Sequence, residues 1–278
     1  MGANRAVTTI APVADARSAR SIRAALLIAL VFSAAGPIAL LATWSVSGDW
    51  FFPALLPRTM TLAAWRSPLG EHRLVSAFGT SVTIAIATSV IACALGLPLG
   101  RLLANLQGWR RHVAAAAAFL PVAAPPLALG TGLQVVAFGT GLAGTDAGVL
   151  IAHLIPAIAY LSLLFLGTFT LFDVRPAEAA RTLGASPSQV WRRVVIPQLR
   201  VPIVEALVIG FLVSWTQFAL TLVVGAGAVR TLPLEVFAFV RAGEDRAAAA
   251  GALLLIIPPA VAFVSLRRAA RLTSALSS

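Results

Sequence analysis

The sequence predicts an all-α integral membrane protein with six transmembrane helices, and three observations support this prediction. Hydrophobic residues make up 59% of the 278 residues and charged residues only 11%, against about a quarter in a typical soluble domain. Six apolar stretches are long enough to cross a bilayer, which takes roughly 20 residues each. The 21 basic residues are all arginine, and most of them fall in alternate connections between these stretches.

The six spans divide the chain into a transmembrane domain and its cytoplasmic parts. The transmembrane domain covers residues 24–266, and tails at 1–23 and 267–278 flank it. The longest cytoplasmic connection, residues 173–200, lies between the fourth and fifth spans. The predicted spans are about 24–44, 75–99, 113–136, 148–172, 204–225 and 247–266.

The first and third spans have features that invite another interpretation. The first has the position of a signal peptide, but its apolar run exceeds the roughly 7–15 residues usual in such a peptide, so we expect a retained helix. The third contains Pro121, Pro125 and Pro126. A membrane helix persists around proline as a kinked helix when neighbours or water satisfy the freed carbonyls. We therefore expect a kink in the third span.

The arginines also predict the orientation of the chain. With the N-terminus inside, fifteen arginines and four acids fall on the inner side, and six arginines and six acids fall on the outer side. This asymmetry satisfies the positive-inside rule, so both termini are expected in the cytoplasm. The net charge of +11 thus follows from the topology. It indicates contact with membrane lipid and no nucleic-acid partner.

Several kinds of chemistry are excluded by the residue types present. Without lysine the chain has neither a P-loop of the form G-x-x-x-x-G-K-[ST] nor a Schiff-base lysine. The single cysteine, Cys93, permits no intramolecular disulfide and no cysteine-based zinc site. No catalytic set or metal-ligand spacing falls within one span, so we expect no catalytic residue, no metal and no cofactor bound by this chain. The isolated His153 and Glu205 are more typical of structural residues.

Uncharged polar residues gather in the third and fifth spans. Gln217 lies near the middle of the fifth, and because a buried amide is unfavourable in lipid it should face other helices or a water-filled path. Hydrogen bonding between helices is the alternative role for such residues, and both roles remain open. The candidate path residues are Thr131, Gln134, Ser214, Trp215, Gln217 and Thr221.

The connection 173–200 contains start and stop signals for two short helices. Pro176 and Glu178 suit a first helical turn, and Gly184 suits a helix end. The stretch Ser186–Gln189 reads S-P-S-Q, which is a capping box with proline at the first helical position. These signals predict a compact protrusion on the cytoplasmic face.

The second of these helices is expected to end near Ile196, because a residue that precedes proline disfavours helical geometry. Small residues on the protrusion, Ala179 and Ala180 among them, allow another surface to approach closely. An amphipathic helix held to lipid headgroups by its arginines is the alternative interpretation.

The connection resembles the EAA loop of the permeases of binding-protein-dependent ABC importers of type I. That pattern is E-A-A-x3-G-x9-I-x-L-P, and the chain departs from it only by valine for isoleucine at 194 and isoleucine for leucine at 196. The resemblance covers about residues 75–266, and it implies a cytoplasmic coupling helix that docks on a separate ATPase. The implied coupling residues are Glu178, Ala179, Ala180, Gly184, Ala185, Ser186, Val194, Ile196 and Pro197.

The resemblance also implies the partners of the chain. ATP and Mg would be bound by two separate ABC ATPase subunits, which agrees with the missing P-loop lysine. A second permease subunit, in a homodimer or a heterodimer, would complete the path. An extracytoplasmic solute-binding protein would deliver a small solute to the outer segments at about 46–73, 138–146 and 225–246. The implied location is the bacterial inner membrane, with a multi-pass topology.

Particular residues bear on the permease subgroup and on two other classes of membrane protein. The sequence S-W-x-Q-F at 214–218 with T-L-P at 231–233 is similar to permeases for polyamines, thiamine, ferric ion or phosphonates. Several of those have an acid where this chain has Gln217, which weakens the case for a cationic solute. An ATPase-independent secondary transporter or channel would predict ionisable residues at mid-membrane or inverted repeats. An intramembrane enzyme would predict a catalytic constellation.

Overall fold

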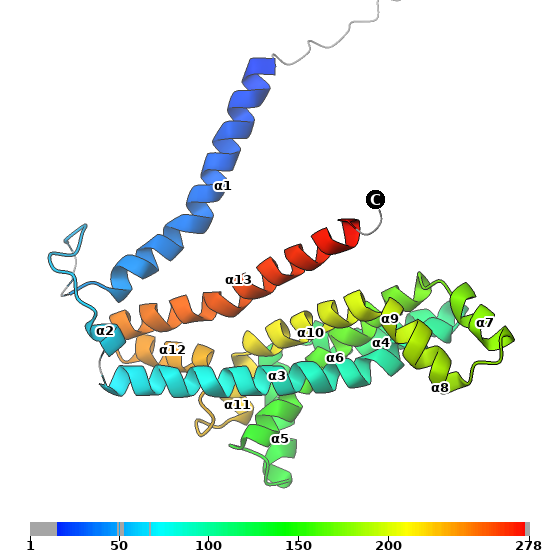
Figure 1. The fold of residues 1–278 in the computed structure, drawn as a ribbon. Helices are drawn as coiled ribbons and strands as arrows, with labels where there is room; N and C mark the ends of the chain where they lie inside the picture. The colour runs from blue at the N-terminus through cyan, green and yellow to red at the C-terminus, as the bar shows by residue number, and fades with distance from the viewer. Residues whose placement is uncertain (1–15, 49, 51–52, 67, 276–278) are drawn as a thin grey trace, which may run out of the picture.

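Long apolar helices make up the fold, and the all-α prediction is confirmed. The computed structural model describes residues 16–48, 50, 53–66 and 68–275. Figure 1 shows the connection 173–200 at one end of the molecule and α2 and α12 at the other. The elements are α1 (Ala16–Ser45), α2 (Ala63–Arg66), α3 (Pro68–Asn105), α4 (Gly108–Ala123), α5 (Pro126–Gly139), α6 (Asp146–Thr170), α7 (Arg175–Thr182), α8 (Pro187–Val190), η1 (Trp191–Val195), α9 (Ile196–Gln198), α10 (Arg200–Trp215), α11 (Ala219–Val224), α12 (Leu232–Arg241) and α13 (Asp245–Ala275).

Four helices among the described residues are long and apolar enough to cross a membrane, and they correspond to the first, second, fourth and sixth predicted spans. The helices α1 and α13 extend beyond the predicted boundaries, because a helix continues past the arginines that delimited the prediction. Of the two predicted tails, residues 1–15 and 276–278 lie outside the described residues. The four membrane-spanning stretches are Ser21–Ser45, His72–Asn105, Asp146–Thr170 and Asp245–Val264.

The other two predicted spans are interrupted. Helices α4 and α5 meet at 90°, a sharper change of direction than the kink expected in the third span. Ala124, the C-cap of α4, has extended backbone angles (φ −70°, ψ 138°), because the residue before a proline is biased away from helical geometry. Helix α10 meets the segment Pro187–Gln198 at 68°, and three non-helical residues, Thr216–Phe218, separate it from α11. The described residues therefore contain four continuous spans, or up to six if each bent pair counts as one.

Helices α3 and α6 pack closely along their length because α3 presents glycine to α6. A Cβ on Gly100 would lie 2.7 Å from the carbonyl oxygen of Ser162, and it would also overlap Phe165. Helix α10 packs on the same pair through Gly210, whose Cβ would lie 3.1 Å from Ser89 Cα. The buried residues shared by these three helices are Ala92, Cys93, Ala157, Leu161, Phe165 and Ala206.

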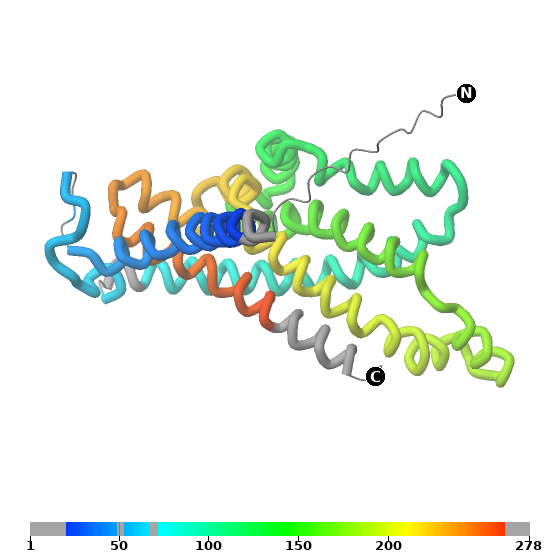
Figure 2. Tube along the Cα trace, turned by 90° about the horizontal axis from the view of Figure 1, so that it is seen from above, coloured from blue at the N-terminus to red at the C-terminus, as the bar shows by residue number. Residues whose placement is uncertain are grey.

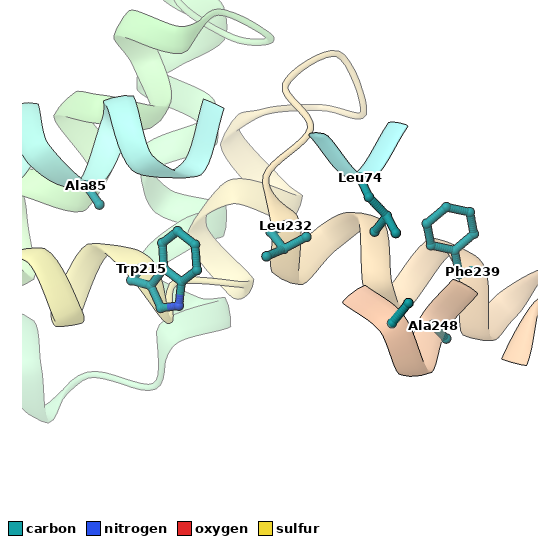
Figure 3. Close-up of a cluster of buried hydrophobic side chains, with 7 residues drawn as sticks. Leu74, Ala85, Trp215, Leu232, Phe239 and Ala248 are labelled. Carbon is teal, nitrogen blue, oxygen red and sulfur yellow. The ribbon is translucent and has the colours of Figure 1, made fainter. Parts of the chain in front are cut away.

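A second core joins four helices toward the end of the molecule opposite the connection 173–200. Figure 3 shows Leu232 and Phe239 of α12 beside Leu74 of α3 and Ala248 of α13, with Trp215 of α10 farther along the cluster. Helix α12 lies within residues 225–246, where no helix was expected from the sequence. Its position follows from burying one apolar face against α3 and α13.

Helix α1 differs from the other spans because its side chains remain exposed from Ser21 to Ala35. It contacts α13, and it leans away from the remaining helices in Figure 1 and lies over them in Figure 2. An apolar helix with this much exposed surface is suited to lipid or to another protein in the membrane.

Candidate functional site

The first candidate site is the connection 173–200, which begins with hydrogen bonds between Asp173 and Arg175 at the start of α7. The Asp173 carboxylate accepts hydrogen bonds from the Arg175 backbone N–H (3.1 Å), Nε (2.9 Å) and Nη2 (2.9 Å). The Arg175 side-chain hydrogen bond is the main reason why the pKa of Asp173 lies below its usual range. Helix α7 then starts with Pro176 in its first turn, as predicted, and Glu178 follows at the positive end of the helix.

The turn after α7 is a Schellman motif centred on Gly184, which has φ +86°. The Gly184 N–H donates to the Arg181 carbonyl (2.9 Å), and the Ala185 N–H donates to the Ala180 carbonyl (3.0 Å). This pair of bonds requires the left-handed conformation that glycine adopts most readily. The predicted helix end at Gly184 is therefore confirmed.

The second helix of the connection starts as predicted but ends later. The Ser186 backbone N–H donates to Gln189 Oε1 (2.8 Å) and the Gln189 N–H donates to Ser186 Oγ (3.4 Å), which forms the capping box. The helix was expected to end near Ile196, before Pro197. It instead continues through α8, η1 and α9 to Gln198. The wide π turn η1, in which the Ile196 N–H bonds the Trp191 carbonyl, accommodates a proline that cannot donate a backbone hydrogen bond.

Buried residues anchor this connection to the adjoining ends of α3, α6 and α10. Ala177, Val190, Val195 and Leu199 form a buried cluster, and the Arg101 guanidinium near the C-terminal end of α3 lies 4.7 Å from the centre of the Trp191 ring. The nine predicted coupling residues divide around this anchor. Ala180, Ala185 and Val194 are half-buried against it, and the exposed ones are Glu178, Ala179, Gly184, Ser186, Ile196 and Pro197.

The structure adds one apolar residue that the sequence analysis did not select. Leu183 lies next to Gly184 at the tip of the connection, and 87% of its surface is exposed. A large apolar side chain exposed on a rigid, capped turn is typical of a contact surface. Its position between two helix-capping signals is the sequence feature from which it could have been identified.

The second candidate site is a polar cluster buried between α6, α10 and α11. His153 Nδ1 lies 2.8 Å from Ser214 Oγ, and His153 Nε2 lies 3.0 Å from Thr221 Oγ1. All three residues are buried. The expected hydrogen bonding of His153 is thus observed, and the bonds place Ser214 and Thr221 together in the protein interior.

The remaining predicted path residues occupy different environments. Trp215 is buried, and its Nε1 donates to the Leu255 carbonyl of α13 (3.1 Å). Gln217 is half-buried in the interruption between α10 and α11. Thr131 is exposed on α5 with its hydroxyl bonded to the Ala128 carbonyl (2.9 Å), and Gln134 is half-buried one turn later. Helix α5 packs on α11 at Gly130, where a Cβ would lie 3.4 Å from Val223.

A third group of polar residues is an ion cluster around Glu235 of α12. Glu235 of α12 is 2% exposed, and its Oε1 lies 2.5 Å from Arg73 Nε in an ion pair that lacks hydrogen-bond geometry. Arg230 Nη1 is farther away, at 3.9 Å from Oε2. The Arg73 guanidinium also lies 4.5 Å from the centre of the Phe239 ring. Across the described residues, no group of three or more His, Cys, Asp or Glu side chains is arranged to hold a metal.

The chain is similar in sequence and in fold to known transport proteins. The chain is 31% identical over 196 residues to the molybdenum transport system permease protein ModB of Mycobacterium bovis, covering 65% of this chain and 74% of that protein. It is 27% identical over 229 residues to the trehalose transport system permease protein SugB of Mycobacterium tuberculosis, covering 81% and 83%. A bacterial alginate ABC transporter, solved in complex with an alginate pentasaccharide-bound periplasmic protein, has the same fold, with a TM-score of 0.66 at 12% identity over 92% of this chain and 96% of that one.

The family is shown by a match over most of the transmembrane domain. Residues 96–272 match the model of the binding-protein-dependent transport system inner membrane component. This segment includes the connection 173–200 and both interrupted spans. The chain therefore belongs to this family, as a multi-pass permease subunit of an ABC importer that acts in transport and not in catalysis.

Proposed function

We propose that the chain forms half of the translocation path for a small solute and is driven by a separate ABC ATPase that docks on the connection 173–200. The observation that carries this proposal is the exposed apolar tip at Leu183 and Gly184. The tip is held rigidly by the Schellman motif on one side and the capping box on the other. A preorganised apolar surface loses little conformational entropy when a partner covers it.

The anchoring of the connection supports a role in transmitting force. The buried cluster beneath the tip and the contact between Arg101 and Trp191 join the connection to α3, α6 and α10. Movement of the tip by an ATPase would therefore displace these helices together. In this proposal the exposed residues Glu178, Ala179, Gly184, Ser186, Ile196 and Pro197 meet the ATPase, and the half-buried Ala180, Ala185 and Val194 support them.

The proposed path runs beside the interruptions in the third and fifth spans. Gln217, Gln134 and Thr131 contribute side chains that are not fully buried, so they are available to a solute or to water. Ser214, Trp215 and Thr221 support the path from behind, since their polar atoms bond within the chain. A second permease subunit, identical or related, supplies the other half.

The proposed topology places both termini and the connection 173–200 in the cytoplasm. The segments around α2 and α12 then face outward, where a solute-binding protein docks. By their names, one relative belongs to a molybdenum transport system and the other to a trehalose transport system. We assign the choice of solute mainly to the binding protein, and ATP with Mg to the ATPase subunits.

Co-purification tests the docking surface directly. Burial of a leucine side chain contributes about 1.5–3 kcal/mol, so Leu183→Asp should lower retention of the ATPase on the affinity-tagged chain by more than about tenfold. Leu55→Asp is the matched control, because Leu55 is 91% exposed but lies in the outer segment. Equal retention by the Leu183→Asp chain and the parent would refute docking at this tip.

A further inference from the structure

Two buried hydroxyls flank the interruption in the fifth span. Ser214 lies in the last turn of α10, Thr221 lies in α11, and Thr216–Phe218 between the two helices are not helical. In an uninterrupted helix the Cα atoms of two residues seven positions apart would be separated by about 10.5 Å. Here both hydroxyls bond to the same imidazole ring, that of His153 on α6. One side chain therefore connects the two halves of the interrupted span.

The hydrogen bonds have a definite direction. Thr221 Oγ1 donates its one proton to the Gln217 carbonyl at 3.0 Å, so it accepts from His153 Nε2–H. In the neutral ring Nδ1 is then the acceptor, and Ser214 Oγ donates to it. A continuous chain thus runs from Ser214 through His153 and Thr221 to the backbone of Gln217. This tautomer is assigned from the hydrogen-bond network.

We infer that His153 is a positioning residue that holds Gln217 at the translocation path by joining α10 and α11 across their interruption. This role deepens the proposed function and rests on it. The ring sets the separation of the two helix ends, and the Thr221 hydroxyl carries that constraint to the Gln217 carbonyl. His153 lies on α6, whose inner end leads into the connection 173–200. The same helix therefore contacts both the coupling segment and the segment that carries Gln217.

A neighbouring residue shows how this differs from ordinary burial of a polar group. Ser162 is also buried on α6, but its hydroxyl donates to the Ala159 carbonyl of its own helix at 2.9 Å. Removing that hydroxyl breaks a hydrogen bond within one helix and none that joins two helices. Removing the imidazole of His153 breaks its hydrogen bonds to Ser214 and Thr221, which lie 61 and 68 residues after it in the sequence.

The test measures labelling of a cysteine at position 217 by a water-soluble thiol reagent in the assembled transporter. Gln217→Cys is introduced with Cys93→Ser and combined in turn with His153→Phe, Thr221→Val, His153→Gln and Ser162→Ala. We expect His153→Phe and Thr221→Val each to change the labelling rate by about tenfold, because hydrogen bonds that fix the segment are lost. His153→Gln, whose amide has both a donor and an acceptor, should restore a rate near that of the parent. Ser162→Ala should leave the rate unchanged.

Transport kinetics give a readout that a packing defect would not reproduce. With Gln217 intact, His153→Phe should lower the maximal transport rate about tenfold and leave unchanged the concentration of loaded binding protein that gives half-maximal rate. Unchanged labelling in both His153→Phe and Thr221→Val would overturn the inference, and so would an equal effect of Ser162→Ala. Complete protection of the Gln217→Cys chain with His153 intact, in resting and ATP-bound states, would instead refute the placement of Gln217 at the path. If the His153→Phe chain does not fold, Thr221→Val provides the same comparison with the imidazole present.

Discussion

Replacement of Gly184 separates the two physical roles that this residue has at the tip of the connection 173–200. Its φ of +86° costs a residue with a Cβ about 1–2 kcal/mol, and asparagine tolerates the conformation better than valine does. A Cβ built there meets no atom of the described residues within 4 Å. Gly184→Val should therefore reduce the ratio of capped to uncapped turn by roughly 5- to 30-fold and leave the packing of the transmembrane helices intact.

Gly184→Asn distinguishes surface contact from backbone strain. Its strain is smaller, but its side chain projects into the docking surface, so we expect both variants to lose ATPase retention and uptake by about fivefold or more. Both should insert in the membrane and unfold at the temperature of the parent chain. The assays are ATPase co-purification, binding-protein-stimulated ATPase activity and thermal unfolding in detergent. Full coupling in both variants would refute the assignment of this surface, and a loss confined to Gly184→Val would show that only the turn conformation matters.

Two further predictions concern the packing of the spans. Gly100→Ala should destabilise the chain by about 1–3 kcal/mol, because its Cβ would meet the Ser162 carbonyl of α6. The control on the same helix is Gly79→Ala, whose Cβ meets nothing within 4 Å among the described residues, so it should not lower the unfolding temperature. Arg73→Ala should cost about 3 kcal/mol, because it leaves the buried Glu235 carboxylate with only a distant partner, whereas Arg230→Ala should cost less than about 1 kcal/mol. Thermal unfolding of the four purified variants measures both comparisons, and a reversal of either order would contradict the packing described.

The features that were predictable from sequence depend on residues close together in the chain. Pro176, Gly184 and the capping box at Ser186 each act within one helical turn, and all three have their predicted roles in the structure. The apolar length of a span is likewise a local property, which is why the four continuous spans were located.

The features that were not predictable depend on contacts between distant segments. The interruption after Trp215 contains no proline, and the His153 contacts that bridge it join residues 61 and 68 positions apart. Helix α12 was missed because its apolar face is explained only by the helices that cover it. The helix that continues through Pro197 depends on a π turn, which simple helix-ending rules do not anticipate.

In the proposed function this chain forms half of the passage, and the energy comes from a separate ATPase. Uptake into liposomes tests this proposal directly, with the chain, its permease partner, the ATPase and the solute-loaded binding protein all purified. We expect uptake only when the ATPase, hydrolysable ATP and loaded binding protein are present together, with loss of uptake when the ATPase carries a substitution in its P-loop lysine. Uptake at the same rate without the ATPase, driven by an ion or solute gradient, would refute the proposed function.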